Sequence, residues 1–159
     1  MNALLDASVI QSLYKASQAG VKVELNVRGI CALRPGVPGV SENIQVISNL
    51  GRFLEHSRIF SFERGGERDF YIGSADMMPR NLYNRVELLV PVADAALKDE
   101  LADILDRSFD HNAGSWELEQ SGDWRRREDG GERRDVQSEL IERHTRLAKR
   151  PITAAAIGA

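Results

Sequence analysis

The feature that most restricts the fold is a β-hairpin pattern near the middle of the chain. Residues 57–63 and 69–74 contain aromatic and β-branched side chains, and Gly65-Gly66 lies between these two segments. Consecutive glycines suit a hairpin turn because glycine adopts positive φ angles at little cost. The pattern therefore predicts two antiparallel strands joined by a tight turn.

Strand and helix patterns alternate along the rest of the chain. Further strands are predicted at residues 22–27, 44–48, 85–92 and 115–120. Apolar residues recur at helical spacing in three other segments, residues 6–19, 94–110 and 136–149. This order predicts an α/β domain in which a mixed β-sheet is flanked by helices.

Two segments are predicted to lack regular structure. Residues 28–43 contain two prolines and three glycines and follow a predicted strand, and residues 75–84 show no regular pattern. Loops at strand ends are where α/β domains usually bind ligands, so the first of these is a candidate binding loop. A chain of 159 residues suits one domain, and we assign it to residues 1–120. Residues 121–159 are predicted to form a polar loop, a surface helix and a frayed tail.

The composition indicates the compartment and the partners to expect. No apolar run approaches the roughly 18 residues that a membrane-spanning helix needs, and the first residues lack the pattern of a secretory signal. The single cysteine, Cys31, cannot form an internal disulfide, which favours a reducing cytoplasm. The net charge of -3 gives no reason to expect a nucleic-acid partner.

Arginines nevertheless gather in the first part of the chain, and a local group of arginines can bind phosphate even when the net charge is negative. Arginines in this part include Arg28, Arg34, Arg52, Arg58, Arg64, Arg80 and Arg85.

Two short motifs flank the hairpin. HSR at residues 56–58 and GSAD at residues 73–76 resemble half of a phospholipase-D-like site, in which H-x-K precedes two strands and a G-S-x-N-like segment. Arginine stands here in the place of the lysine. Three longer runs narrow the resemblance: ASQAGVKVELNVRGICALRPGVPGVSENI, GRFLEHSRIF and GSADMMPRNLYNRVELLVPV resemble the C-terminal domain of class-1 polyphosphate kinase.

This resemblance implies a phospholipase-D-like half domain and a function. Enzymes of the family reversibly transfer the terminal phosphate of ATP to inorganic polyphosphate, through a phosphohistidine and with Mg²⁺. The phosphorylated histidine belongs to a preceding domain that this chain does not contain. His56 corresponds to the second histidine of the site, and Arg28, within VRGIC, corresponds to a nucleotide-binding arginine. No metal ligand is assigned in this chain. The implied partners are ATP or ADP, polyphosphate, upstream domains of the same enzyme and further copies in a homo-oligomer.

The chemistry of the two residues agrees with these roles. Phosphoryl transfer needs cations around the moving phosphate, and the guanidinium of Arg28 offers a two-pronged contact to phosphate oxygens. Histidine ionises close to neutral pH, so His56 is suited to act as a general acid or a hydrogen-bond donor.

Other interpretations stay open at this point. His56 alone is more often a structural residue, and Arg58 fits a site or a solvated strand face equally well. Asp76 or Ser74 would orient His56, whereas Arg80 and Arg85 are expected to be salt-bridge partners, with a ligand contact left open for Arg80.

Two alternative functions remain besides the kinase domain. One is a dimeric phospholipase-D-like phosphodiesterase, in which each chain supplies half of the site. The other is a non-catalytic module that binds nucleotide or polyphosphate.

Overall fold

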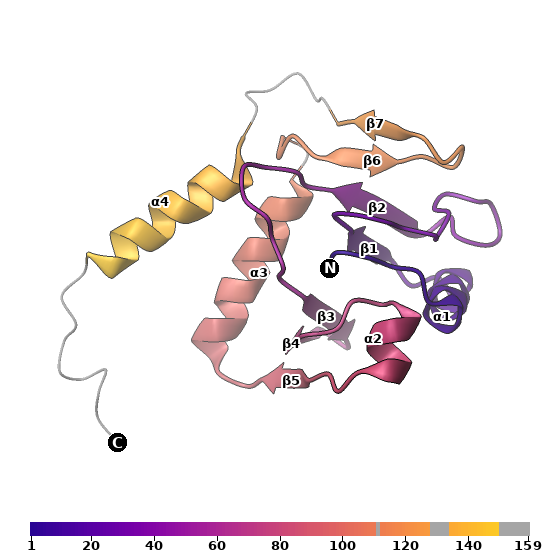
Figure 1. Ribbon diagram of the computed structural model, residues 1–159, viewed down its shortest axis with the longest axis horizontal. Helices are drawn as coiled ribbons and strands as arrows, with labels where there is room; N and C mark the ends of the chain where they lie inside the picture. The colour runs from indigo at the N-terminus through magenta and orange to yellow at the C-terminus, as the bar shows by residue number, and fades with distance from the viewer. Residues whose placement is uncertain (111, 128–133, 150–159) are drawn as a thin grey trace.

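The computed structural model describes residues 1–110, 112–127 and 134–149 (Figure 1). The helices are α1 (Ala7–Gln18), α2 (Pro79–Asn84), α3 (Ala95–Phe109) and α4 (Val136–Ala148). The strands are β1 (Val23–Asn26), β2 (Ile44–Ser48), β3 (Ile59–Arg64), β4 (Glu67–Gly73), β5 (Leu89–Val92), β6 (Trp116–Leu118) and β7 (Trp124–Arg126). No helix in the described part of the chain is long and apolar enough to cross a membrane.

The first sheet has four strands in the order β1-β2-β6-β7 and contributes half of the residues of the hydrophobic core. β1 and β2 are parallel, and the other two pairs are antiparallel, so the sheet is mixed as expected. Helix α1 lies beside β1 in Figure 1. Asp6 caps this helix by accepting a hydrogen bond from the backbone N–H of Val9 at 3.0 Å. The core residues are Leu4, Ile10, Leu25, Val27, Leu33, Ile44, Val46 and Leu118.

The second sheet is antiparallel, has the order β3-β4-β5 and contains the predicted hairpin. Gly65 and Gly66 both have positive φ, at 61° and 87°, which explains why the turn needs glycine at these positions. The predicted α/β class is thus confirmed, with two sheets in place of one. Residues 49–58 carry the chain from the first sheet to the second without a strand.

The N-terminal segment joins the two sheets. The backbone of Leu4 donates to the carbonyl of Ile30 at 2.9 Å, and the next residue, Leu5, donates to the carbonyl of Met77 at 2.8 Å. The first contact reaches the loop after β1, and the second reaches the segment between β4 and α2. These bonds hold the ends of both sheets side by side, which places their loops around a common space.

Three local predictions were wrong. The segment expected to be irregular contains α2, which begins at Pro79, a favoured first residue of a helix. The strand expected at residues 85–92 begins only at Leu89, because the backbone N–H of Leu88 donates to the side-chain hydroxyl of Ser74 and does not continue the ladder. The polar loop expected after residue 120 contains β7, which pairs with β6.

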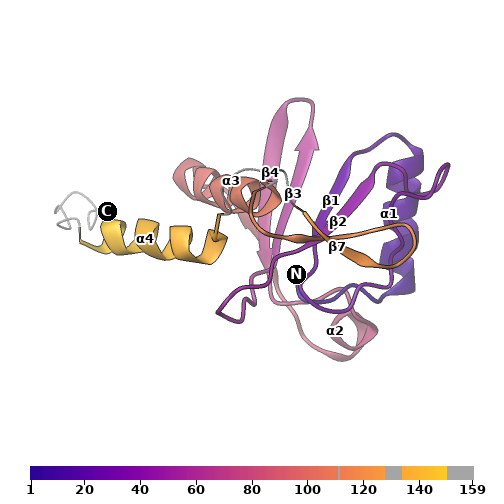
Figure 2. The same cartoon turned by 90° about the horizontal axis from the view of Figure 1, so that it is seen from above.

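The division of the chain at residue 120 stays a prediction. β7 lies beyond that point and completes the first sheet, and α4 follows as a helix with no buried residue. Figure 2 shows α4 extending away from the two sheets. The expected frayed tail, residues 151–159, lies outside the described residues, as do residues 128–133 of the polar loop.

Candidate functional site

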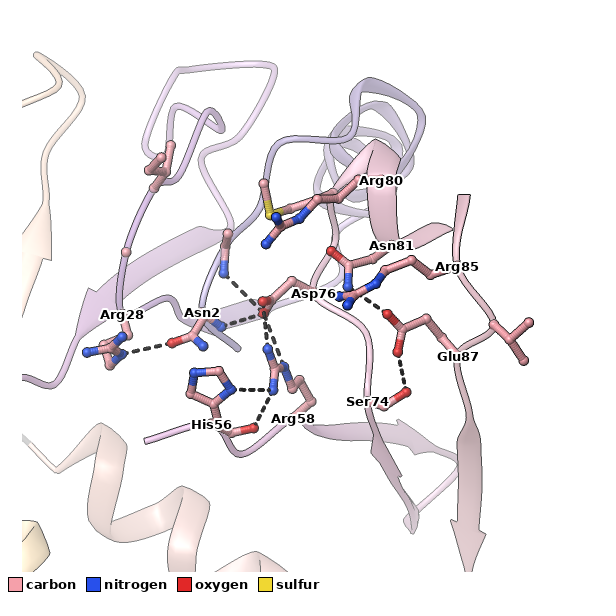
Figure 3. Close-up of a pocket in the computed structure, with 15 residues that line it drawn as sticks. Asn2, Arg28, His56, Arg58, Ser74, Asp76, Arg80, Asn81, Arg85 and Glu87 are labelled. Atoms are coloured by element: carbon pink, nitrogen blue, oxygen red, sulfur yellow. Dashed lines mark hydrogen bonds and ion pairs between the residues drawn. The ribbon is translucent and has the colours of Figure 1, made fainter. Parts of the chain in front are cut away.

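A pocket of about 640 Å³ lies where the loop after β1, the segment before β3 and the segment between β4 and β5 meet (Figure 3). Its lining is dominated by charged side chains that are far apart in the sequence. The ionisable residues that line it are Arg28, His56, Arg58, Asp76, Arg80, Arg85 and Glu87. The two predicted site residues, Arg28 and His56, therefore line one pocket.

Arg28 lies in the loop after β1, separated from the strand by Val27, and is half-buried. Its Nε donates to Asn2 Oδ1 at 2.8 Å, and its backbone N–H donates to the carbonyl of Met1 at 3.1 Å. Within the described residues no hydrogen bond uses its two Nη nitrogens. The N-terminal segment therefore fixes the stem of the guanidinium and leaves its outer edge for a ligand.

Arg58 and Asp76 form a nearly buried ion pair in the floor of the pocket, with side chains 11% and 8% exposed. Arg58 Nη2 donates to Asp76 Oδ2 at 2.7 Å, and its Nε donates to Oδ1 at 3.2 Å. The backbone N–H groups of Asn2 and Ala3 also donate to Oδ1, at 2.7 and 3.3 Å. Burial alone would raise the pKa of Asp76, but these hydrogen bonds outweigh it and hold the pKa below its ordinary value.

His56 lies in the exposed segment before β3, and its partner is Arg58. Arg58 Nη1 lies 3.2 Å from His56 Nδ1 and donates to the carbonyl of His56 at 2.7 Å. The alternating pattern of residues 57–63 did not decide whether Arg58 belongs to the site or to a solvated strand face. In the structure Arg58 lines the pocket. Asp76 reaches His56 only through Arg58.

Ser74 does not contact His56, contrary to the orienting role considered for it. Its hydroxyl donates to Glu87 and accepts from the backbone N–H of Leu88 at 3.0 Å. Asn81 Nδ2 donates to Glu87 at 2.7 Å, whereas the buried Oδ1 of Asn81 has no hydrogen-bond partner among the described residues. The bonds from Ser74 and Asn81 lower the pKa of Glu87, so this carboxylate stays ionised beside the arginines.

Arg80 and Arg85 were expected to pair with acidic residues. Both are exposed at the pocket, and within the described residues neither forms an ion pair with a carboxylate. The sequence thus left a ligand contact open for Arg80 and gave none for Arg85. The available signals were their place in the arginine-rich first part of the chain and their nearness to the GSAD motif, and these signals did not separate pocket residues from surface charges.

The described residues do not form a metal site. No group of three or more His, Cys, Asp or Glu side chains in residues 1–110, 112–127 and 134–149 is arranged to hold a metal ion. Asp76 is occupied by Arg58, and Glu87 is occupied by Ser74 and Asn81. The donor set therefore does not fit Mg²⁺, and we derive no step through that ion.

Comparison with known proteins gives a consistent result. The family model described as polyphosphate kinase C-terminal domain 2 matches residues 1–139. The polyphosphate kinase of Rhodopirellula baltica is 56% identical over 126 residues, which cover 79% of this chain and 15% of the relative. Polyphosphate kinase 1 of Chlorobaculum tepidum is 46% identical over 149 residues, which cover 94% of this chain and 21% of the relative.

A solved structure matches as well. The crystal structure of polyphosphate kinase from Porphyromonas gingivalis matches with a TM-score of 0.86 and 40% identity. The match covers 92% of this chain and 23% of that one. The chain thus spans about a fifth of the length of the curated relatives it matches. From the family match and these similarities, the chain belongs to the polyphosphate kinase C-terminal domain family.

Proposed function

We propose that this chain is the C-terminal catalytic domain of a polyphosphate kinase and forms half of its active site. The single observation that carries the proposal is the meeting of Arg28 and His56 in one arginine-rich pocket. The two residues are far apart in the sequence: Arg28 lies in the loop after β1, and His56 lies in the segment before β3. A pocket that gathers cations in this way suits a ligand with several phosphate groups.

In the proposed reaction the bond between the β- and γ-phosphates of ATP breaks and ADP leaves. The phosphoryl group passes to a histidine of a preceding domain and then to the terminal oxygen of a polyphosphate chain. The reverse sequence forms ATP from ADP. This chain contributes binding and charge stabilisation, which are the main tasks of a protein in phosphoryl transfer.

Arg28 and His56 have separate roles in this proposal. The free edge of the Arg28 guanidinium binds a phosphate of the nucleotide by a two-pronged contact. The His56 imidazole donates a hydrogen bond or a proton to a phosphate oxygen close to the point of transfer. ATP, ADP and Mg²⁺, the upstream domains, a homo-oligomer and a cytoplasmic location follow from the family resemblance and stay predictions.

Calorimetric titration of the chain with ADP, ATP and polyphosphate tests the proposal. We expect Arg28→Ala to weaken nucleotide binding about 10- to 100-fold, since a hydrogen bond to a charged group contributes roughly 1.5–3 kcal/mol. His56→Ala should weaken binding as well, with the circular dichroism spectrum unchanged. Arg68→Ala is the matched control, because Arg68 lies on β4 outside the pocket. Equal affinities in wild type, Arg28→Ala and His56→Ala would contradict the assignment.

A further inference from the structure

We infer that Arg58, held in place by Asp76, is a positioning residue that presents His56 to the ligand with its proton on Nε2. The inference rests on the proposed function, in which His56 donates a hydrogen bond or a proton to a phosphate oxygen. It specifies Nε2 as the donor atom. It also changes the role expected of Arg58. At the position where the phospholipase-D-like motif has a lysine, this chain uses an arginine for internal support.

The guanidinium of Arg58 is held in one orientation. Its guanidinium makes two contacts with Asp76, at 2.7 and 3.2 Å, and two contacts fix the plane of the group where one contact would leave it free to turn. Asp76 is itself held by the backbone N–H groups of Asn2 and Ala3. The orientation of Arg58 is therefore set by the N-terminal segment that joins the two sheets.

Arg58 in turn contacts both the ring and the backbone of His56. Arg58 Nη1 lies 3.2 Å from His56 Nδ1 and 2.7 Å from the carbonyl oxygen of the same residue. A guanidinium has donors only, so Nδ1 must be the acceptor, and the proton of the neutral ring is then on Nε2. The bond to the carbonyl holds the backbone of His56, which lies in a segment without regular structure. The guanidinium of Arg58 thus fixes both the ring and the backbone of His56.

The contact with Arg58 leaves the other nitrogen of the His56 ring for a ligand. Figure 3 shows the Nδ1 edge of His56 turned toward Arg58 and the rest of the ring on the side of Arg28. Nε2–H is therefore the free donor of the ring. The nitrogens of Arg58 are all engaged with Asp76 and His56, so this arginine has no free fork for phosphate. Phosphate contacts are then left to His56 and the other arginines of the pocket, Arg28, Arg80 and Arg85.

The tautomer of His56 can be measured without a ligand. Nitrogen-15 spectra of the imidazole rings at about pH 8.5, where histidine is ordinarily neutral, report which ring nitrogen carries the proton. We expect His56 in the wild-type chain to be almost entirely the Nε2–H form. In Arg58→Met the shifts should move toward the mixture of an unconstrained histidine. Free histidine measured under the same conditions serves as the reference for an unconstrained ring, because His144 Nε2 on α4 lies 3.5 Å from Glu100. A mixed tautomer in the wild type would overturn the inference.

The effect on binding is tested by a double-mutant cycle between Arg58 and His56 with ADP as the ligand. If Arg58 acts through His56, Arg58→Met lowers affinity, and the variant with both changes binds no more weakly than His56→Ala alone. Additive losses would show that Arg58 contacts the ligand itself and would overturn the positioning role. Arg68→Met, outside the pocket, is the control for the loss of one positive charge.

Two further variants separate positioning from folding and from simple charge. Arg58→Lys keeps the charge but cannot reach both partners of the fork, so we expect it to behave like Arg58→Met. Wild-type affinity in Arg58→Lys would mean that a point charge suffices and that the inference is wrong. If Arg58→Met fails to fold, a double variant with Arg58→Gln and Asp76→Asn takes its place. This variant leaves no unpaired buried charge. If the wild type fails to bind ADP, the proposed function is contradicted but the inference about Arg58 is not. The nitrogen-15 spectra test the contact between Arg58 and His56 without a ligand.

Discussion

At the scale of single residues, the pocket depends on how closely the N-terminal segment approaches the loop after β1. The backbone N–H of Gly29 donates to the carbonyl of Asn2 at 2.8 Å, and a Cβ at Gly29 would lie 2.9 Å from that same oxygen. The side chain of Asn2 in turn holds Arg28. Glycine is thus required beside Arg28 for close packing, although its φ is not in the left-handed region.

This close approach predicts the effect of Gly29→Ala. The added methyl group must push the carbonyl of Asn2 away, and overpacking of this kind costs about 1–3 kcal/mol of folding stability. Because Asn2 moves, Arg28 loses its anchor and ADP affinity falls as well. Urea denaturation and calorimetry measure the two effects. Asn2→Ala is the control, since it removes the anchor without the clash and should weaken binding with a smaller loss of stability. An unchanged urea midpoint in Gly29→Ala would contradict the packing argument.

At the scale of elements, α4 is attached by polar contacts, since none of its residues is buried. Arg143 pairs with Glu100 and Asp103 of α3 at 2.6 and 2.8 Å, and Arg107 of α3 pairs with Glu139 of α4 at 2.7 Å. The hydrogen bonds that Arg107 donates to Asp103 and, with a smaller effect, to Glu139 raise its pKa. A helix attached through several ion pairs should dock less firmly at high salt, because exposed charges are screened.

The same helix reaches the segment that carries His56. Gln137 Oε1 accepts from the backbone N–H of Phe53 at 2.8 Å, and its Nε2 donates to the carbonyl of Phe53 at 2.9 Å and to Glu55 at 2.7 Å. A Cβ at Gly51 would come within 3.0 Å of the side-chain amide of Gln137. The segment before His56 is thus held from one side by α4 and from the other by Arg58.

Gln137→Ala should therefore loosen the segment before His56. We expect amide hydrogen exchange to become faster at Phe53 and its neighbours, with the core strand β2 unaffected, because local opening needs only the local bonds to break. Gln45→Ala is the matched control. Its amide also makes a side-chain hydrogen bond, to Glu117 at 2.8 Å, but in the first sheet. Equal exchange rates at Phe53 in wild type and Gln137→Ala would show that α4 does not restrain this segment.

At the scale of the whole molecule, the two sheets and α4 are joined through carboxylates with lowered pKa values. Asp76 joins the N-terminal segment to Arg58, and Asp103 and Glu139 join α3 to α4. The hydrogen bond from Arg107 lowers the pKa of Asp103, and the bond from Arg134 lowers that of Glu139. The connections between parts of the fold are therefore more sensitive to acid than its apolar core.

This predicts a loss of stability in acid. The folded pKa of each carboxylate lies below its ordinary value, 3.8 for aspartate and 4.5 for glutamate, so the unfolded chain takes up protons first as the pH falls. Stability should be fully present above about pH 5 and fall progressively below about pH 4. Urea denaturation at several pH values measures this. Asp76→Asn should be less stable at neutral pH, because Arg58 stays buried without its partner, and should lose less on acidification. A wild-type profile that is flat down to pH 3 would contradict the prediction.

Much of the fold was predictable from local patterns, because its signals lie within a few residues. Asp6 before α1 and Gly65-Gly66 between β3 and β4 specify a cap and a turn through their own backbone preferences. The six-residue helix α2 was missed since it is too short to show helical periodicity. β7 was missed because its WRR sequence, rich in charge, becomes a strand only by pairing with β6.

The sequence by itself determined the α/β class, the family, and Arg28 and His56 as the residues to examine, since each depends on short runs of residue types. Only the tertiary structure decided that the strands divide into two sheets and that Arg58 pairs with Asp76 beneath His56. It also brought Arg80 and Arg85 to the same pocket. The physical reason is that two groups form a hydrogen bond only where the fold places them close together. Here the N-terminal segment between the sheets sets the positions of these groups.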